Sequence, residues 1–164
     1  MRFIVLGFLL TACTNTAPPP ASTDTVCPDP DPDTLTWDDF GQKFMSDYCT
    51  VCHASTLKHA QRNGAPLYHD YDTLFGVLET PDHIDQYAGA GPAAHNSRMP
   101  PDRCPTEPGG SINRDCPEPT DAERANLSMW LACERNRPHC TGRPSAATPT
   151  PTPTPTGDER PPAR

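Results

Sequence analysis

The distribution of proline limits what this chain can fold into more than any other feature of the sequence. Of the 164 residues, 23 are proline, and many lie near the two ends. The N-terminal part contains Pro18-Pro19-Pro20 and the repeat Asp29-Pro30-Asp31-Pro32, and a Thr-Pro repeat runs from Thr148 to Thr156. Proline cannot continue a helix or a central strand, and neither region shows apolar periodicity. We therefore expect an extended spacer over residues 13–33, one folded domain over 34–142, and a disordered tail over 143–164.

The first twelve residues have the pattern of an export signal. Arg2 supplies the positive charge, and the apolar run from Phe3 to Leu10 is too short to span a bilayer. The following Leu10-Thr11-Ala12-Cys13 resembles the lipobox of bacterial lipoproteins. This resemblance implies removal of residues 1–12, acylation of Cys13 and a periplasm-facing lipoprotein held on a membrane. Thr14, rather than aspartate, follows the cysteine and favours the outer membrane.

Near the start of the predicted folded domain lies the pentapeptide Cys49-Thr50-Val51-Cys52-His53. Cys-x-x-Cys-His is the attachment pattern of a c-type haem. Two thiols at this spacing can both form thioethers with the haem vinyl groups, and the histidine then lies under the ring as an axial iron ligand. Cys-x-x-Cys could also be a redox dithiol or half of a zinc site. Against these alternatives, the chain lacks a second Cys/His pair at zinc spacing and a surrounding βαβ pattern.

The motif follows a stretch with helical periodicity. Phe40, Phe44 and Tyr48 recur at four-residue spacing, and Thr36 can cap the start of their helix. Gly41 lies inside this helix, where glycine costs about 1 kcal/mol relative to alanine. We therefore expect another helix to approach closely at Gly41.

Further helices are predicted downstream. An i, i+3, i+4, i+7 stripe predicts a helix over residues 70–79: Tyr71, Leu74, Phe75 and Leu78. Pro81 suits the first turn of a short helix that ends near Tyr87. The last helix is expected to begin at Thr120, with Glu123 in the capping-box position, and to end near residue 135.

Met99 is the candidate for the second iron ligand. It lies in a polar loop immediately before Pro100 and Pro101, which hold it in extended conformation. A lone methionine usually serves packing. This loop offers no apolar face for it to join, so the sequence favours a thioether presented to the iron opposite His53.

Taken together, the residues from 36 to 134 resemble a monohaem class I cytochrome c of the bacterial lipoprotein type. Gly41 stands eight residues before Cys49, Met99 is followed by two prolines, and the segment Glu123 to Leu131 carries a Leu-x-x-aromatic-Leu face. The resemblance implies an all-α fold: a small helical domain around one covalently bound haem, with extended tails. It also implies that a proline carbonyl, here that of Pro66, accepts the Nδ1–H of His53. The segment between Cys104 and Cys116 is an addition, and Met45 occupies the place of the expected aromatic residue.

The cysteines left over from haem and lipid attachment are candidates for disulfides. They are five: Cys27, Cys104, Cys116, Cys133 and Cys140. Eight cysteines in a short exported chain indicate an oxidising compartment. Cys104–Cys116 is the first choice, and a second bridge could join Cys133 to Cys140 or either of them to Cys27. Because five is odd, at least one of them must be free or paired outside the chain.

Function is predicted from the ligand set and the charge. His/Met ligation of a single haem c fills both axial positions, which predicts a one-electron carrier rather than an enzyme. The formal net charge of −8 becomes −9 when the segment containing Arg2 is removed. That charge disfavours nucleic acid and is compatible with basic redox proteins of the cell envelope as partners for a monomeric domain.

Two other functions remain open at this point. A haem-based sensor or small haem enzyme would need a distal site that opens, with Met99 replaced by one of four histidines: His59, His69, His83 or His95. A disulfide-held structural lipoprotein would contain no haem at all.

Overall fold

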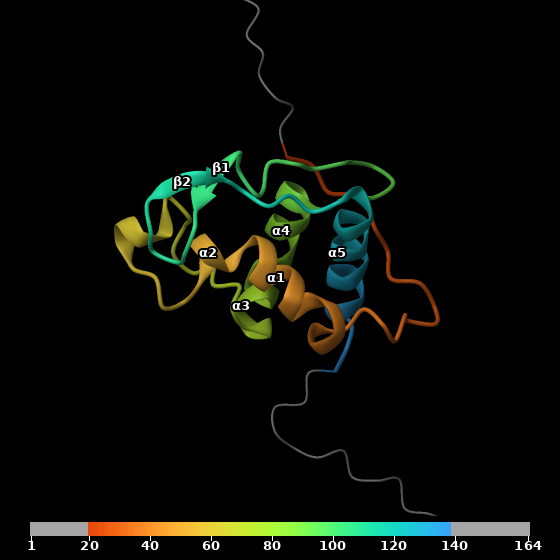
Figure 1. The fold of residues 1–164 in the computed structure, drawn as a ribbon. Coiled ribbons are helices and arrows are strands. Elements are labelled where there is room, and N and C mark those ends of the chain that lie inside the picture. The colour runs from red at the N-terminus through yellow and green to blue at the C-terminus, as the bar shows by residue number, and fades with distance from the viewer. Residues whose placement is uncertain (1–19, 139–164) are drawn as a thin grey trace, which may run out of the picture.

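A computed structural model describes residues 20–138 of the chain. In chain order its elements are η1 (a π-helix, Trp37–Gly41), α1 (Gln42–Tyr48), α2 (Thr50–His53), η2 (a 3-10 helix, His59–Arg62), α3 (Leu74–Glu79), α4 (Pro81–Ala88), β1 (Arg103–Pro105), β2 (Ile112–Asp115) and α5 (Asp121–Glu134) (Figure 1). The predicted signal segment, lipidation residue Cys13, Cys140 and the tail lie outside the described residues. Within residues 20–138, no helix has the length and apolar character needed to cross a membrane.

The prediction of an all-α fold is wrong. β1 and β2 form a two-stranded antiparallel sheet, in which Arg103 lies opposite Asp115. The hairpin is held by polar side chains, including a 2.9 Å ion pair between these two residues and a 2.7 Å hydrogen bond from Thr106 to Asn113. Every residue of β2 is exposed, so the sequence lacks the apolar alternation that marks a half-buried strand. Figure 1 shows the hairpin beside α2, and β1 contacts α2 directly.

The core lies where the first and last helical segments meet. A Cβ atom added to Gly41 would lie 2.3 Å from Cζ2 of the buried Trp130 of α5, which confirms the predicted close approach of another helix. The indole N–H of Trp130 is satisfied by the Glu134 carboxylate at 2.9 Å. The remaining core members are contributed by α1, α3, α4, α5 and the loop before α3: Phe44, Met45, Tyr71, Val77, Ile84, Ala88, Leu127 and Leu131.

Most of the predicted helix starts are confirmed. The Thr36 side chain accepts a hydrogen bond at the start of η1, Pro81 occupies the first turn of α4, and Thr120 forms a full capping box. The helix predicted over residues 70–79 is shorter, because the Thr73 hydroxyl caps it and the helix begins at Leu74.

Residues 20–33, which we call the N-terminal strap, were predicted as part of a free spacer and instead pack against α4 and α5 (Figure 1). Thr23 is buried, and its N–H and hydroxyl donate to the Asp85 carboxylate at 2.9 and 2.8 Å. The Ser128 hydroxyl donates to the same carboxylate at 2.6 Å. Three donors thus satisfy a carboxylate that is buried in the interior.

Two further links fasten the strap to the C-terminal end of α5. Cys27 is disulfide-bonded to Cys133, one of the pairings left open by the sequence. Arg137 forms an ion pair with Asp31 and donates to the Leu35 carbonyl at 2.6 Å. These contacts are covalent or polar, so a search for apolar periodicity could not detect them. The folded unit therefore begins well before residue 34.

Candidate haem site

Cys49, Cys52 and His53 are arranged around one helical turn. The Cys49 N–H ends α1 by donating to the Met45 carbonyl at 2.9 Å, and the Cys49 carbonyl accepts from the N–H groups of Cys52 and His53 at 3.1 and 3.0 Å. Both cysteines are free thiols. Residues three apart on a helix project from the same face, so both sulfur atoms can be offered to one ligand.

The His53 imidazole is oriented by a backbone carbonyl. Its Nδ1 lies 3.1 Å from the carbonyl oxygen of His69, which can only accept, so Nδ1 carries the proton. Burial lowers the pKa of His53 to about 4, which keeps the ring neutral at pH 7. A neutral ring protonated on Nδ1 has its lone pair on Nε2. This is the state required of an imidazole that ligates a metal.

The acceptor of His53 is therefore not Pro66, as predicted, but His69. The Pro66 carbonyl is engaged elsewhere, because it accepts a hydrogen bond from Nη2 of Arg62 at 2.7 Å. The loop that follows the motif is wrapped around this guanidinium. Its path brings the carbonyl three residues beyond Pro66 to the histidine ring.

Arg62 is buried, with 2% of its surface exposed. Its guanidinium donates to the carbonyl of Ala54 at 3.1 Å and to that of His69 at 2.9 Å, and it pairs with the Asp70 carboxylate at 2.7 Å. The His69 oxygen thus accepts from both Arg62 and His53. A buried positive charge consequently lies one carbonyl away from the candidate axial ligand.

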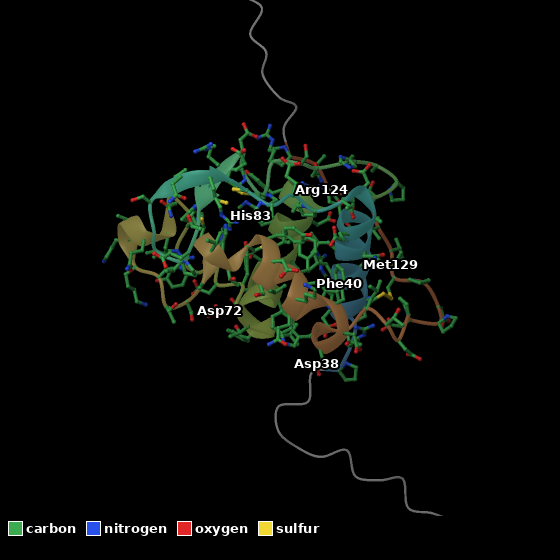
Figure 2. All side chains as sticks on the ribbon, in the orientation of Figure 1. Asp38, Phe40, Asp72, His83, Arg124 and Met129 are labelled. Atoms are coloured by element: carbon green, nitrogen blue, oxygen red, sulfur yellow. A yellow bond between two sulfur atoms is a disulfide. The ribbon has the colours of Figure 1, made fainter. Side chains whose placement is uncertain are left out.

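A row of rings leads from His53 toward α4. The Tyr71 ring stacks on His53 with centroids 4.6 Å apart, and His69 lies 6.2 Å from His53. The ring centroids of His69 and His83 are 4.7 Å apart, and those of His83 and Tyr87 are 4.5 Å apart; His83 is labelled in Figure 2. We call these five residues the ring row. Of the histidines considered as alternative ligands, His69 and His83 belong to it.

The other two alternative histidines, His59 and His95, are exposed on the surface. His59 begins η2, and Nε2 of His95 lies 3.0 Å from the Asp121 carboxylate. The structure does not bring either of them into the ring row.

Met99 is held by its backbone near the far end of the ring row. Its N–H donates to the Tyr87 carbonyl at 2.9 Å, and its carbonyl accepts from Nη1 of Arg124 at 2.8 Å. Its surface is 37% exposed. The ring row thus connects the segment that carries Met99 with the one that carries His53.

The predicted Cys104–Cys116 disulfide is absent from the structure, in which both residues are free thiols. The Cys116 thiol is hydrogen-bonded to Cys104, and burial raises the pKa of Cys116 to about 12. Burial likewise raises the pKa of the Cys49 thiol to about 12 and raises that of Cys52. Cys104 lies in β1 opposite Arg114, and Cys116 follows the last residue of β2, so the hairpin brings the two thiols together without a bond between them.

Sequence reasoning missed the two buried arginines, Arg62 and Arg124. For Arg124 a signal existed: its spacing of three from Leu127 and seven from Leu131 places it on the apolar face of α5. Arg62 lies in a polar loop, and nothing in its local pattern distinguishes it from a solvated residue.

The donor groups present fit a haem c. Two free thiols on one turn can form the two thioethers, His53 offers Nε2, and the Met99 loop can offer a thioether. No protein family, curated protein or solved structure was found to match the chain.

Proposed function

We propose that this chain is a membrane-tethered one-electron carrier that binds a single haem c. The observation that carries the proposal is the geometry of the Cys49–His53 turn. Two free thiols and a neutral imidazole lie on one turn. Nδ1 of that imidazole is hydrogen-bonded to the His69 carbonyl, so Nε2 is the nitrogen left to bind a metal. A redox dithiol would have no need of this oriented histidine.

Each residue has a defined role in this proposal. Cys49 and Cys52 hold the cofactor covalently, and His53 binds through Nε2, with its basicity raised by the hydrogen bond from Nδ1 to His69. Met99 supplies the second axial ligand, and Pro100 and Pro101 stiffen its loop. The bound haem supplies the reversible one-electron couple of its iron.

Rapid electron transfer needs a site that changes little between the two oxidation states. Here both ligand segments are fastened through backbone atoms to buried guanidinium groups, the His69 carbonyl to Arg62 and the Met99 carbonyl to Arg124. Guanidinium groups present several donors in a rigid plane, so each can hold more than one carbonyl in place. Both ligand segments are thereby stabilised in one geometry.

The remaining features suit a tethered carrier. A lipid on Cys13 would hold the protein on a membrane facing the periplasm, and only the short segment between Cys13 and the N-terminal strap would link the lipid to the folded unit. The net negative charge would favour docking to basic redox proteins of the envelope. Under this proposal the chain itself catalyses no reaction.

The test is to produce the complete chain in a bacterial host that has haem-attachment machinery and to purify it in detergent. We expect a coloured protein whose haem stays with the denatured polypeptide, and a low-spin ferric spectrum with the far-red band of iron–methionine ligation. Met99→Leu should abolish that band. The matched control, Met129→Leu on α5, should retain it. A colourless wild-type product would refute the proposal and favour the structural lipoprotein.

A haem-based sensor is the second candidate, because two histidines considered as alternative ligands, His69 and His83, both belong to the ring row. Binding of carbon monoxide to the ferrous protein separates the two functions. A carrier with both axial positions filled should bind carbon monoxide weakly, and a sensor with an open or displaceable ligand should bind it tightly.

A further inference from the structure

The Met99 carbonyl accepts a hydrogen bond from Arg124 of α5, a residue labelled in Figure 2. The residue is buried, with 2% of its surface exposed. A single nitrogen, Nη1, lies within hydrogen-bonding distance of three carbonyl oxygens: Ala88 at 3.0 Å, Asn96 at 3.1 Å and Met99 at 2.8 Å. These carbonyls belong to the end of α4 and to both ends of the segment that precedes the two prolines.

A buried cation in this position needs compensation. Burial lowers the pKa of Arg124, and the negative charges of Glu118 and Asp121 act in the opposite direction. The three carbonyl dipoles supply the direct contacts, and they share the two N–H bonds of Nη1. Because removal of either partner would leave buried polar groups without a hydrogen bond, the guanidinium and the loop stabilise each other.

The rest of the loop completes this arrangement. The Met99 N–H donates to the Tyr87 carbonyl at 2.9 Å, and the Asn96 N–H donates to the Gly89 carbonyl at 2.8 Å. Both backbone polar groups of Met99 are therefore engaged, one by α4 and the other by α5. Only the side-chain torsions of Met99 remain to place its sulfur.

We propose that Arg124 is the positioning residue for the distal ligand: it fixes the Met99 segment so that the second axial position is closed to external ligands. This inference rests on the proposed function, because it gives Met99 the role of an iron ligand. It goes further in assigning the choice between electron carrier and ligand binder to a residue on another helix, which does not touch the cofactor.

The experiment compares three variants of the complete holoprotein. Arg124→Gln removes the charge and most of the donors, Arg124→Lys keeps the charge, and Arg137→Gln is the matched control. Arg137 also donates to carbonyls and carboxylates, but its partners lie in the N-terminal strap and at the end of α5. The readouts are the far-red band, the dissociation constant of imidazole for the ferric protein, and the thermal unfolding midpoint.

We expect Arg124→Gln to weaken the far-red band and to tighten imidazole binding about tenfold or more, as follows from the loss of charge-assisted hydrogen bonds. Arg124→Lys should recover part of both. Arg137→Gln should lower the unfolding midpoint and leave the band and the imidazole affinity unchanged. If Arg124→Gln retains the wild-type band and imidazole affinity, or if Arg137→Gln changes them equally, the inference is overturned.

If Arg124→Gln does not fold, Arg124→Lys and the wild-type protein still decide the question. Hydrogen exchange at the Met99 amide of the wild-type holoprotein should be slow, and rapid exchange there would contradict a fixed segment. The proposed function fails separately. A wild-type protein without the far-red band refutes Met99 ligation itself, whereas a wild-type band that is insensitive to both Arg124 substitutions refutes only the role of Arg124.

Discussion

Removal of the Cys27–Cys133 disulfide is expected to be the most destabilising conservative change available outside the core. The two cysteines are 106 residues apart in the sequence. In the chain-entropy treatment, a cross-link closing a loop of about 100 residues stabilises the folded state by about 4.7 kcal/mol. Total stability for a domain of this size is about 5–15 kcal/mol, so the loss would be a large share of it.

The figure is an upper value for the double variant Cys27→Ser/Cys133→Ser. The N-terminal strap retains its other contacts, from Thr23 to Asp85 and from Asp31 to Arg137. We therefore expect a loss of about 3–4 kcal/mol in the free energy of unfolding. The assay is equilibrium urea denaturation followed by the fluorescence of the two tryptophans, one of which, Trp130, lies in the core.

The matched control is Cys104→Ser/Cys116→Ser. The structure has no bond between these cysteines, so the control should lose only the small contribution of a buried thiol pair. A disulfide there would instead be worth about 3 kcal/mol, because the loop is short. The reasoning is refuted if the Cys27/Cys133 variant unfolds within about 1 kcal/mol of wild type, or if the control loses as much as the variant does.

Three further predictions concern the helices and the proximal loop. Gly41→Ala should lower the thermal unfolding midpoint, because the new Cβ would lie 2.3 Å from Trp130. Overpacking costs about 1–3 kcal/mol, which exceeds the helix-propensity gain of about 1 kcal/mol. An unchanged or higher midpoint would contradict the close packing of Gly41 against Trp130. The pKa of Glu123 is lowered chiefly by the hydrogen bond from the backbone N–H of Thr120. The ionised carboxylate therefore stabilises the fold above the unfolded-state pKa of about 4.3, and this contribution is lost as pH falls through the lower folded value. The free energies of unfolding of wild type and Glu123→Gln, measured by urea titration, should differ at pH 7 and converge in acid. Under the proposed function, Arg62→Gln should lower the reduction potential in a redox titration, because it removes a buried positive charge beside the candidate ligand His53; an unchanged or raised potential would contradict this account.

Several elements of the structure were predictable because their signals are local. The Thr36 and Thr120 caps, Pro81 at the start of α4 and the close approach at Gly41 depend on residues within one turn, or on the absence of a side chain. The helical turn at Cys49–His53 is also local, because its hydrogen bonds join residues that are three and four apart.

The hairpin and the N-terminal strap were not predictable in this way. β2 is exposed throughout and its pairing depends on polar cross-strand partners, while the strap depends on a buried carboxylate, Asp85, and a cysteine at the other end of the domain. Such contacts join residues that are distant in the sequence and leave no periodic pattern. The all-α prediction failed for this reason.

The sequence by itself determined most of the helix starts and singled out the Cys49–His53 turn and the candidate ligands. Only the tertiary structure decided which carbonyl orients His53, because Arg62 takes the Pro66 oxygen and the loop delivers that of His69 instead. It also decided that Arg124 holds the Met99 segment and that Cys27 pairs with Cys133. A hydrogen bond or a disulfide needs two groups within a few ångströms, and the distance between groups that are far apart in the sequence is a property of the packed chain.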